Sequence, residues 1–115
     1  MAGAQDIPEE TQEKIKQLQM LEQALQQLLA QKQAFQLQLM ETESALKELE
    51  GTNEAYSIIG NIMVLTKKEE LGNELQEKKE TTMLRINALE KQEAKTREKA
   101  SSLQKDVLAV IRKHE

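Results

Sequence analysis

The stretch that most constrains the fold of this chain lies near its centre, at Glu54–Thr66, and reads EAYSIIGNIMVLT. It is the only segment with the composition of β-strands, rich in branched and aromatic side chains. Two such runs are separated by Gly60-Asn61. Glycine at the first position of a two-residue turn supplies the positive φ that such a turn needs. The stretch therefore predicts a tight β-hairpin.

This hairpin carries more apolar surface than the rest of the chain can cover. Its second run, Ile62–Leu65, is apolar at four consecutive positions, so both faces of that strand need to be buried. A two-stranded hairpin is marginal on its own and leaves two open edges. We therefore predict that copies of the hairpin pair with hairpins of other subunits. The predicted assembly residues are the turn glycine and the apolar side chains around it: Tyr56, Ile58, Ile59, Gly60, Ile62, Met63, Val64 and Leu65.

The composition favours long helices over a compact core. Of the 115 residues, 2% are aromatic and 31% are charged, so the bulky side chains that fill a globular core are scarce. The formal net charge of −4 is spread along the chain, which argues against nucleic acid as a partner. The chain has no cysteine for disulfides or thiol chemistry. Because it lacks a signal-like apolar stretch and a membrane span, we predict a cytoplasmic chain with no membrane partner.

The residues before the hairpin predict one helix from about residue 8 to residue 50. Asp6 can cap its start, with Glu9 three residues later and Pro8 in the first turn. No further glycine or proline follows until Gly51, which suits a left-handed C-cap. Apolar residues recur at alternating spacings of three and four, which is the heptad seam of a coiled coil. The seam runs through Leu18, Leu21, Leu25, Leu28, Lys32, Phe35, Leu39, Thr42, Leu46 and Leu49.

A second helix is predicted from about residue 67 to residue 114. Thr66 and Glu69 have the spacing of a capping box at its start, and Gly72 weakens its first turns. Polar residues interrupt its seam, which runs through Leu75, Lys79, Thr82, Ile86, Leu89, Glu93, Thr96, Ala100, Leu103, Val107, Val110 and His114. Two helices of similar length can fold back as an antiparallel pair in which residues near 15 face residues 103–110.

The predicted fold is therefore mainly α, in a single domain over residues 1–115. A long antiparallel coiled coil of two helices is joined by a β-hairpin at about residues 54–66, and both chain ends lie together at the far end of the helix pair.

The sequence offers little support for catalysis. The one histidine, His114, is next to last, where it suits a helix C-terminus as a cation. The many carboxylates lie on helix surfaces without a partner arrangement that would perturb them. The sequence contains no glycine-rich phosphate loop and no metal-ligand spacing. We therefore predict that the chain is not an enzyme and has no catalytic residue, metal site or cofactor.

The outer ends of the two helices carry apolar residues that lie off the seam: Ile15, Met20, Leu108 and Ile111. One interpretation is a widened seam where the helix pair is covered or splayed. The other is an exposed apolar surface that holds non-native chains. Methionine suits that task because it is unbranched and adapts to many shapes. The sequence alone leaves both interpretations open.

The order of helix, hairpin with a glycine turn, and helix resembles a β-type prefoldin subunit, and particular residues support the resemblance. Ala55–Thr66 is similar to the hairpin of that family, which reads Val-Tyr-Lys-x-x-Gly-x-Ile-Leu-Val-Lys. Leu75–Thr81 and Arg85–Glu93 are similar to the opening of its second helix. Leu65 departs from the pattern, since the family often has a basic residue there. One hairpin favours the β type over the α type, and the layout resembles archaeal members.

The resemblance implies an ATP-independent chaperone, typically a hexamer of two α-type and four β-type subunits. In that family the hairpins form an inter-subunit double β-barrel. The coiled-coil arms hold unfolded polypeptides and deliver them to a group II chaperonin. The client-binding residues at the arm tips would then be Ile15, Leu18, Met20, Leu21, Val107, Leu108, Val110 and Ile111.

The alternative is a structural coiled-coil scaffold or spacer. Such a protein explains the heptad seam equally well, but a rod has no need of a hairpin that is apolar on two sides.

Overall fold

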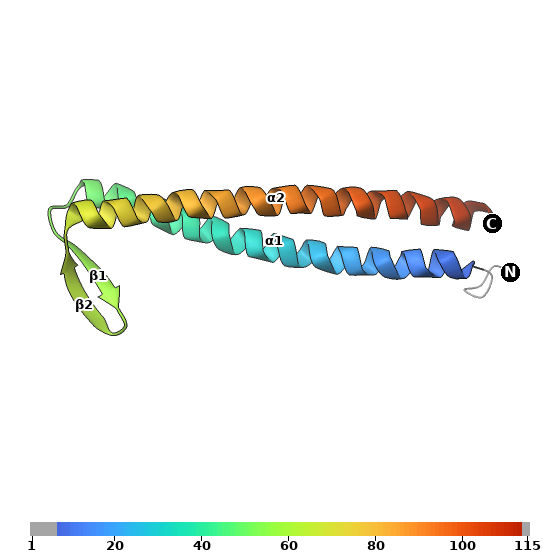
Figure 1. Ribbon diagram of the computed structural model, residues 1–115, viewed down its shortest axis with the longest axis horizontal. Coiled ribbons are helices and arrows are strands. Elements are labelled where there is room, and N and C mark those ends of the chain that lie inside the picture. Colours follow the sequence, from blue (N-terminus) through green and yellow to red (C-terminus); the bar gives the residue numbers. More distant parts are fainter. Residues whose placement is uncertain (1–6, 114–115) are drawn as a thin grey trace. The chain divides into compact units, whose positions relative to one another are not determined.

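The computed structural model describes residues 7–113 as two long helices with a β-hairpin between them (Figure 1). The order is α1 (Glu9–Glu50), β1 (Ala55–Ile59), β2 (Ile62–Thr66) and α2 (Lys68–Lys113). The predicted mainly α fold, with two helices joined by an antiparallel hairpin, is thereby confirmed. Asp6 and His114 lie outside the described residues, so the contact assigned to Asp6 and the seam position of His114 stay predictions. The predicted place of Pro8 in the first turn is wrong, because α1 begins at Glu9 and the Pro8 carbonyl accepts its first hydrogen bond, from the Gln12 amide at 3.0 Å.

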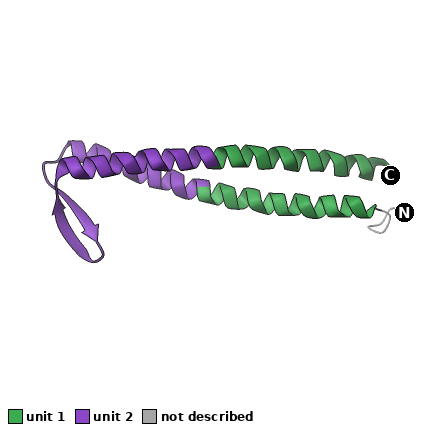
Figure 2. Ribbon diagram, in the orientation of Figure 1, with its two compact units in different colours: residues 1–31, 89–115 green, residues 32–88 purple. Residues whose placement is uncertain are grey.

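The chain divides into two units, which are coloured separately in Figure 2. Unit 1 contains residues 1–31 and 89–115, and unit 2 contains residues 32–88. In unit 1 the Nζ atom of Lys14 lies 3.5 Å from an Asp106 carboxylate oxygen, which fits the predicted pairing of residues near 15 with residues 103–110. In unit 2 the Arg85 guanidinium carbon lies 5.5 Å from the centre of the Phe35 ring. Further along, Leu21 and Leu103 line one groove in unit 1, and Leu49 lies beside Gly72 in unit 2, so α1 and α2 run antiparallel in each unit. That the two units make up one domain stays a prediction.

Burial along both helices follows the predicted seam. Every seam residue from Leu18 to Leu49, and from Leu75 to Val110, is buried or half-buried. The most deeply buried apolar side chains of the helices all belong to it: Leu28, Leu49, Ile86 and Val107. The register is therefore confirmed for both helices, because only heptad spacing keeps one stripe of residues turned towards a partner helix over this length.

Buried threonines at the seam satisfy their hydroxyl groups within their own helix. Thr42 donates a hydrogen bond to the Gln38 carbonyl at 2.8 Å, and Thr82 donates one to the Lys78 carbonyl at 2.7 Å. Both threonines are 3% exposed. Among the described residues, no buried side-chain nitrogen or oxygen lacks a hydrogen-bond partner. The polar interruptions of the seam therefore leave no unsatisfied group behind.

The predicted capping box at the start of α2 is wrong. The Leu71 amide donates to the Lys67 carbonyl at 3.0 Å, which places the N-cap at Lys67 and leaves Thr66 in β2. The Thr66 hydroxyl donates instead to the Ser57 hydroxyl at 2.9 Å, across the hairpin. Thr66 therefore belongs to the strand pair and not to the start of the helix, where the local spacing had placed it.

The predicted left-handed cap at Gly51 is also wrong, because Gly60 is the only described residue with positive φ. Instead, α1 ends in a tighter turn, in which backbone hydrogen bonds join residues three apart instead of four. The Gly51 amide donates to the Glu48 carbonyl at 3.2 Å, and the Thr52 amide donates to the Leu49 carbonyl at 3.4 Å. The Lys68 ammonium also donates to the Glu50 carbonyl at 3.4 Å. These bonds satisfy the last carbonyls of α1 without a left-handed residue.

The hairpin turn forms at the predicted glycine. Gly60 has φ 61°, and Ile59 pairs with Ile62 across a two-residue connection. Asn61 has a negative φ, so only the first turn position is left-handed, which is the signature of a type II′ turn. This turn matches the twist of the two strands and sets their register.

Gly72→Ala is expected to stabilise the chain. Gly72 lies inside α2 without a positive φ, and a Cβ atom there would lie 3.5 Å from Leu49 Cδ2, an ordinary van der Waals distance. Alanine should raise the free energy of unfolding by about 0.5–1 kcal/mol, since it loses less backbone entropy in a helix than glycine. Chemical denaturation followed by helical circular dichroism measures the change. Gly51→Ala, which lies outside the helix, serves as the control and should change little; a loss of stability at Gly72 would contradict the expectation.

Candidate functional site

The register of the hairpin sorts its side chains onto two faces. Residues that pair directly across the two strands lie on the same face. One face carries Tyr56 opposite Leu65 and Ile58 opposite Met63. All four side chains are exposed, from 51% at Tyr56 to 74% at Ile58. We call these four residues the apolar face.

The opposite face is mixed in character. Near the helices it carries the Ser57–Thr66 hydroxyl pair and Ala55, which is the only buried residue of either strand. Towards the turn it carries Ile59 and Ile62, which are both exposed. The hairpin is therefore anchored at its base, while the remainder of both faces is open to solvent.

All eight predicted assembly residues lie in or beside this open part of the hairpin. The seven apolar ones are at least 41% exposed, the lowest value being that of Val64. Covering a side chain of this size contributes about 1.5–3 kcal/mol when burial is complete. With two open backbone edges, the hairpin is chemically suited to add further strands and to bury its apolar face against them.

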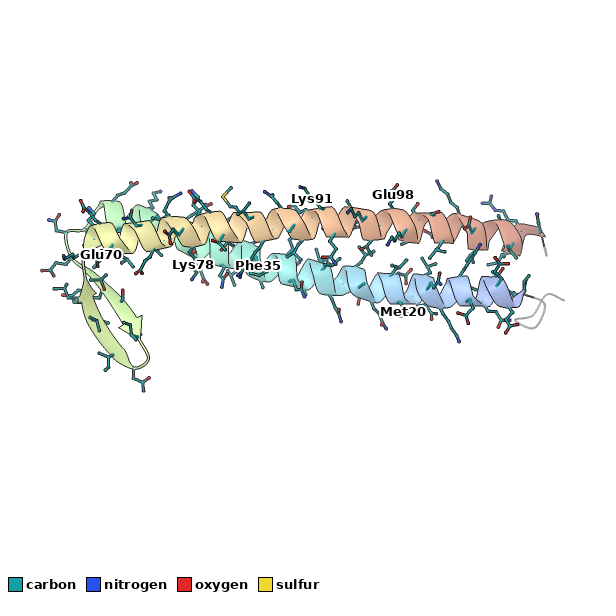
Figure 3. All side chains as sticks on the ribbon, viewed as in Figure 1. Met20, Phe35, Glu70, Lys78, Lys91 and Glu98 are labelled. Carbon is teal, nitrogen blue, oxygen red and sulfur yellow. The ribbon has the colours of Figure 1, made fainter. Side chains whose placement is uncertain are left out.

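The eight residues predicted to bind clients lie in unit 1 and fall into three groups. Met20, labelled in Figure 3, is 68% exposed, and Leu108 is 42% exposed. Ile15, Leu18, Leu21, Val110 and Ile111 are half-buried, and Val107 is buried. The seam members of the set hold the two helices together, whereas Met20 and Leu108 face solvent. The stripe widens at Ile15 and Ile111, and apolar surface is exposed beside it at Met20 and Leu108, so the choice between the two interpretations stays open.

A groove of about 610 Å³ lies between α1 and α2 of unit 1. It is lined by Gln17, Met20, Leu21, Ala24, Lys99, Ser102 and Leu103. Met20 and Leu21 belong to the predicted set, while the other five residues were not predicted. Ala24 and Ser102 contribute short side chains to this lining, one from each helix. The groove could have been identified from the sequence, because small residues lie next to the seam where the two antiparallel helices face each other.

A second set of exposed apolar residues, which the sequence interpretation missed, lies in unit 2. It consists of Leu37, Met40, Met83 and Leu84, with Leu84 69% exposed. All four lie outside the seam, three of them at outward-facing positions and Met83 beside it, so the seam register could have identified them. The confirmed register identifies large apolar residues at positions away from the stripe as candidates for exposed surface.

Within residues 7–113, no group of three or more histidine, aspartate and glutamate side chains is placed to hold a metal ion. No helix in that range is both long and apolar enough to cross a membrane.

Comparison with known proteins agrees with the geometry. The family model described as prefoldin subunit matches residues 12–113. The prefoldin subunit beta of Thermococcus onnurineus is 40% identical, over 94% of this chain and 96% of its own length. That of Archaeoglobus fulgidus is 40% identical, over 86% and 88%. The crystal structure of the prefoldin beta subunit from Thermococcus strain KS-1 superposes with a TM-score of 0.83 and 39% identity, covering 90% of this chain and 93% of that one. With its two long helices, one hairpin and this similarity over nearly its whole length, the chain belongs to the prefoldin family of chaperone subunits, as a β-type member.

Proposed function

We propose that this chain is a subunit of an ATP-independent chaperone that holds unfolded polypeptides at the ends of its helices and delivers them to a group II chaperonin. Membership of the family implies a hetero-oligomer with other prefoldin subunits. The specific assembly we propose contains two α-type and four β-type subunits and uses no cofactor. The observation that carries the proposal is the apolar face of the hairpin, because a chain with so little other apolar material cannot cover it alone.

Assembly through the hairpins follows from the strand edges and the apolar face together. Each edge offers unpaired backbone amides and carbonyls to a neighbouring strand. Added strands from other subunits would cover Tyr56, Ile58, Met63 and Leu65 on a common side. Closure of the strands into a barrel would leave no open edge. The domain formed by residues 1–115 would then contribute its hairpin to the barrel and leave its helices outside it.

Client holding is assigned to the ends of the helices in unit 1. Aliphatic surface attracts exposed apolar groups without directional demands, so it suits a holder of many different unfolded chains. Met20 and Leu108 offer such surface directly, and the half-buried residues beside them add to it where the helix ends move apart. The residues proposed to take part are the eight predicted ones: Ile15, Leu18, Met20, Leu21, Val107, Leu108, Val110 and Ile111.

The competing function is a structural scaffold or spacer whose helices pair with a fixed partner. The regular seam supports it as well as it supports a chaperone. The exposed hairpin does not, because a rod gains nothing from an apolar face at its middle.

The test combines native mass measurement with light scattering. With an α-type subunit, the chain should form a hexamer of two α-type and four β-type subunits. That hexamer should suppress the aggregation of a chemically unfolded client without ATP, and the suppression should end when a group II chaperonin removes the client. A monomer whose hairpin is covered by its own helices would contradict the assembly. A plain dimer that leaves client aggregation unchanged would favour the scaffold.

A further inference from the structure

We infer that the groove of unit 1 favours client segments in which acidic side chains accompany apolar ones. The inference rests on the proposed function and names the class of polypeptide segment that the groove takes. It is carried by the placement of lysines on and beside a groove whose remaining lining is uncharged.

The lining of the groove is mainly apolar. Four of its seven lining residues are apolar: Met20, Leu21, Ala24 and Leu103. Met20 is 68% exposed, so its flexible thioether side chain is free to adapt to an incoming apolar group. A segment that enters this groove therefore needs at least one apolar side chain.

Lys99 is the only charged residue that lines the groove. Lys95 lies one helical turn before it, on the same side of α2. Both lysines are exposed, and neither makes an ion pair within the described part of the chain. A lysine can lay its aliphatic stem along apolar surface while its ammonium stays hydrated at the rim. The groove thus has an apolar floor and a cationic rim.

The positive charges of Lys95 and Lys99 are not neutralised by the described carboxylates around them. Glu98 is next to Lys99 in sequence, but its side chain points away from α1 (Figure 3). Asp106 pairs with Lys14, and Glu93 pairs with Arg97 at 2.9 Å. Glu13, one turn before Gln17, does not line the groove. Residues 94–113 of α2 carry six basic side chains against two acidic ones, whereas residues 9–31 of α1 carry two basic against four acidic, so the positive charge at the groove is local to its α2 side.

This arrangement distinguishes clients by charge as well as by apolarity. An acidic group beside a docked apolar side chain would come within reach of Lys99 or Lys95, while a basic group would be repelled. Exposed ion pairs are weak, and each contributes a factor of about two to five in affinity. Salt weakens such attraction, since charges are screened over about 8–10 Å at ordinary ionic strength.

The experiment uses the full chain and three fluorescent peptides that share the same leucines and differ only in their flanking residues, which are glutamate, glutamine or lysine. By fluorescence anisotropy at low salt, the glutamate peptide should bind about 3–10-fold more tightly than the lysine peptide, with the glutamine peptide between them. Half-molar salt should reduce the difference to less than about twofold. Lys99→Glu should abolish or reverse the preference without changing helical circular dichroism, because Lys99 is exposed.

A second variant separates the groove from general electrostatics. Met20→Ser should weaken all three peptides by a similar factor of about ten and keep their order. Lys91→Glu, which changes an exposed lysine of the same helix that does not line the groove, should leave the preference as it is.

Equal binding of the three peptides, or a preference that survives Lys99→Glu, would overturn the inference while the chaperone function stands. Failure of the chain to bind any of the peptides would overturn it as well. The suppression of client aggregation then decides the proposed function separately, since that assay does not depend on peptide charge.

Discussion

Ile58→Glu should leave the subunit folded but unable to assemble. Ile58 is the most exposed side chain of the apolar face, at 74%, and it lies directly opposite Met63. In the free chain a glutamate there stays in water, so the free energy of unfolding should change by no more than about 0.5 kcal/mol. In the assembly the same carboxylate would be buried without a partner, at a cost of several kcal/mol in each subunit.

Native mass measurement with an α-type subunit checks this result: the hexamer should disappear, while helical circular dichroism stays unchanged. Leu84→Glu is the matched control, because Leu84 is 69% exposed and lies on α2 rather than in the hairpin. The control should assemble normally. Hexamers of unchanged mass and stability from the Ile58 variant would place the assembly surface elsewhere on the chain.

Replacing Met20, Leu108 and Ile111 together by serine should abolish the suppression of client aggregation without affecting assembly. Met20 and Leu108 are exposed, and Ile111 is half-buried in the last turns of α2, so their loss removes little packing from the subunit. It does remove apolar area at which an unfolded chain could dock, at about 25 cal/mol per Å² of contact. Light scattering of an unfolded client measures suppression, and native mass measures assembly.

The matched control removes three exposed apolar side chains from unit 2, through Leu37→Ser, Met40→Ser and Leu84→Ser. It should keep most of the suppression. If both triple variants lost activity alike, client holding would be spread over the helices, and the assignment to the eight residues of unit 1 would be wrong.

The structural features that the sequence predicted correctly are those that depend on a repeating pattern or on a residue with a special conformation. Heptad spacing gave the register of both helices, including its polar positions, because each seam residue is supported by others one turn away. The hairpin was predictable because Gly60 has a conformational role that few residues can take, and the structure gives it φ 61°.

Single-residue capping signals failed where another part of the fold competed for the same group. Thr66 has the spacing of a helix cap, yet its hydroxyl bonds to Ser57 across the strands. The end of α1 needed no left-handed Gly51, because Lys68, distant in sequence, reaches the Glu50 carbonyl. Tertiary partners of this kind cannot be seen in a local window of sequence. The groove was missed for a related reason, since it depends on Ala24 and Ser102 coming to the same level of two helices.

The unequal faces of the hairpin have a geometric consequence for any assembly built by strand addition. Each new hairpin has to turn Tyr56, Ile58, Met63 and Leu65 to the same side as its neighbour, so successive subunits repeat one rotation of fixed hand. A repeated rotation that closes gives a ring with a defined lumen, whereas one that does not close gives an open filament. The other side, which carries Val64, Ile59 and Ile62 beside the Ser57–Thr66 hydroxyl pair, would then need cover of its own outside the ring, and ring closure makes growth self-limiting.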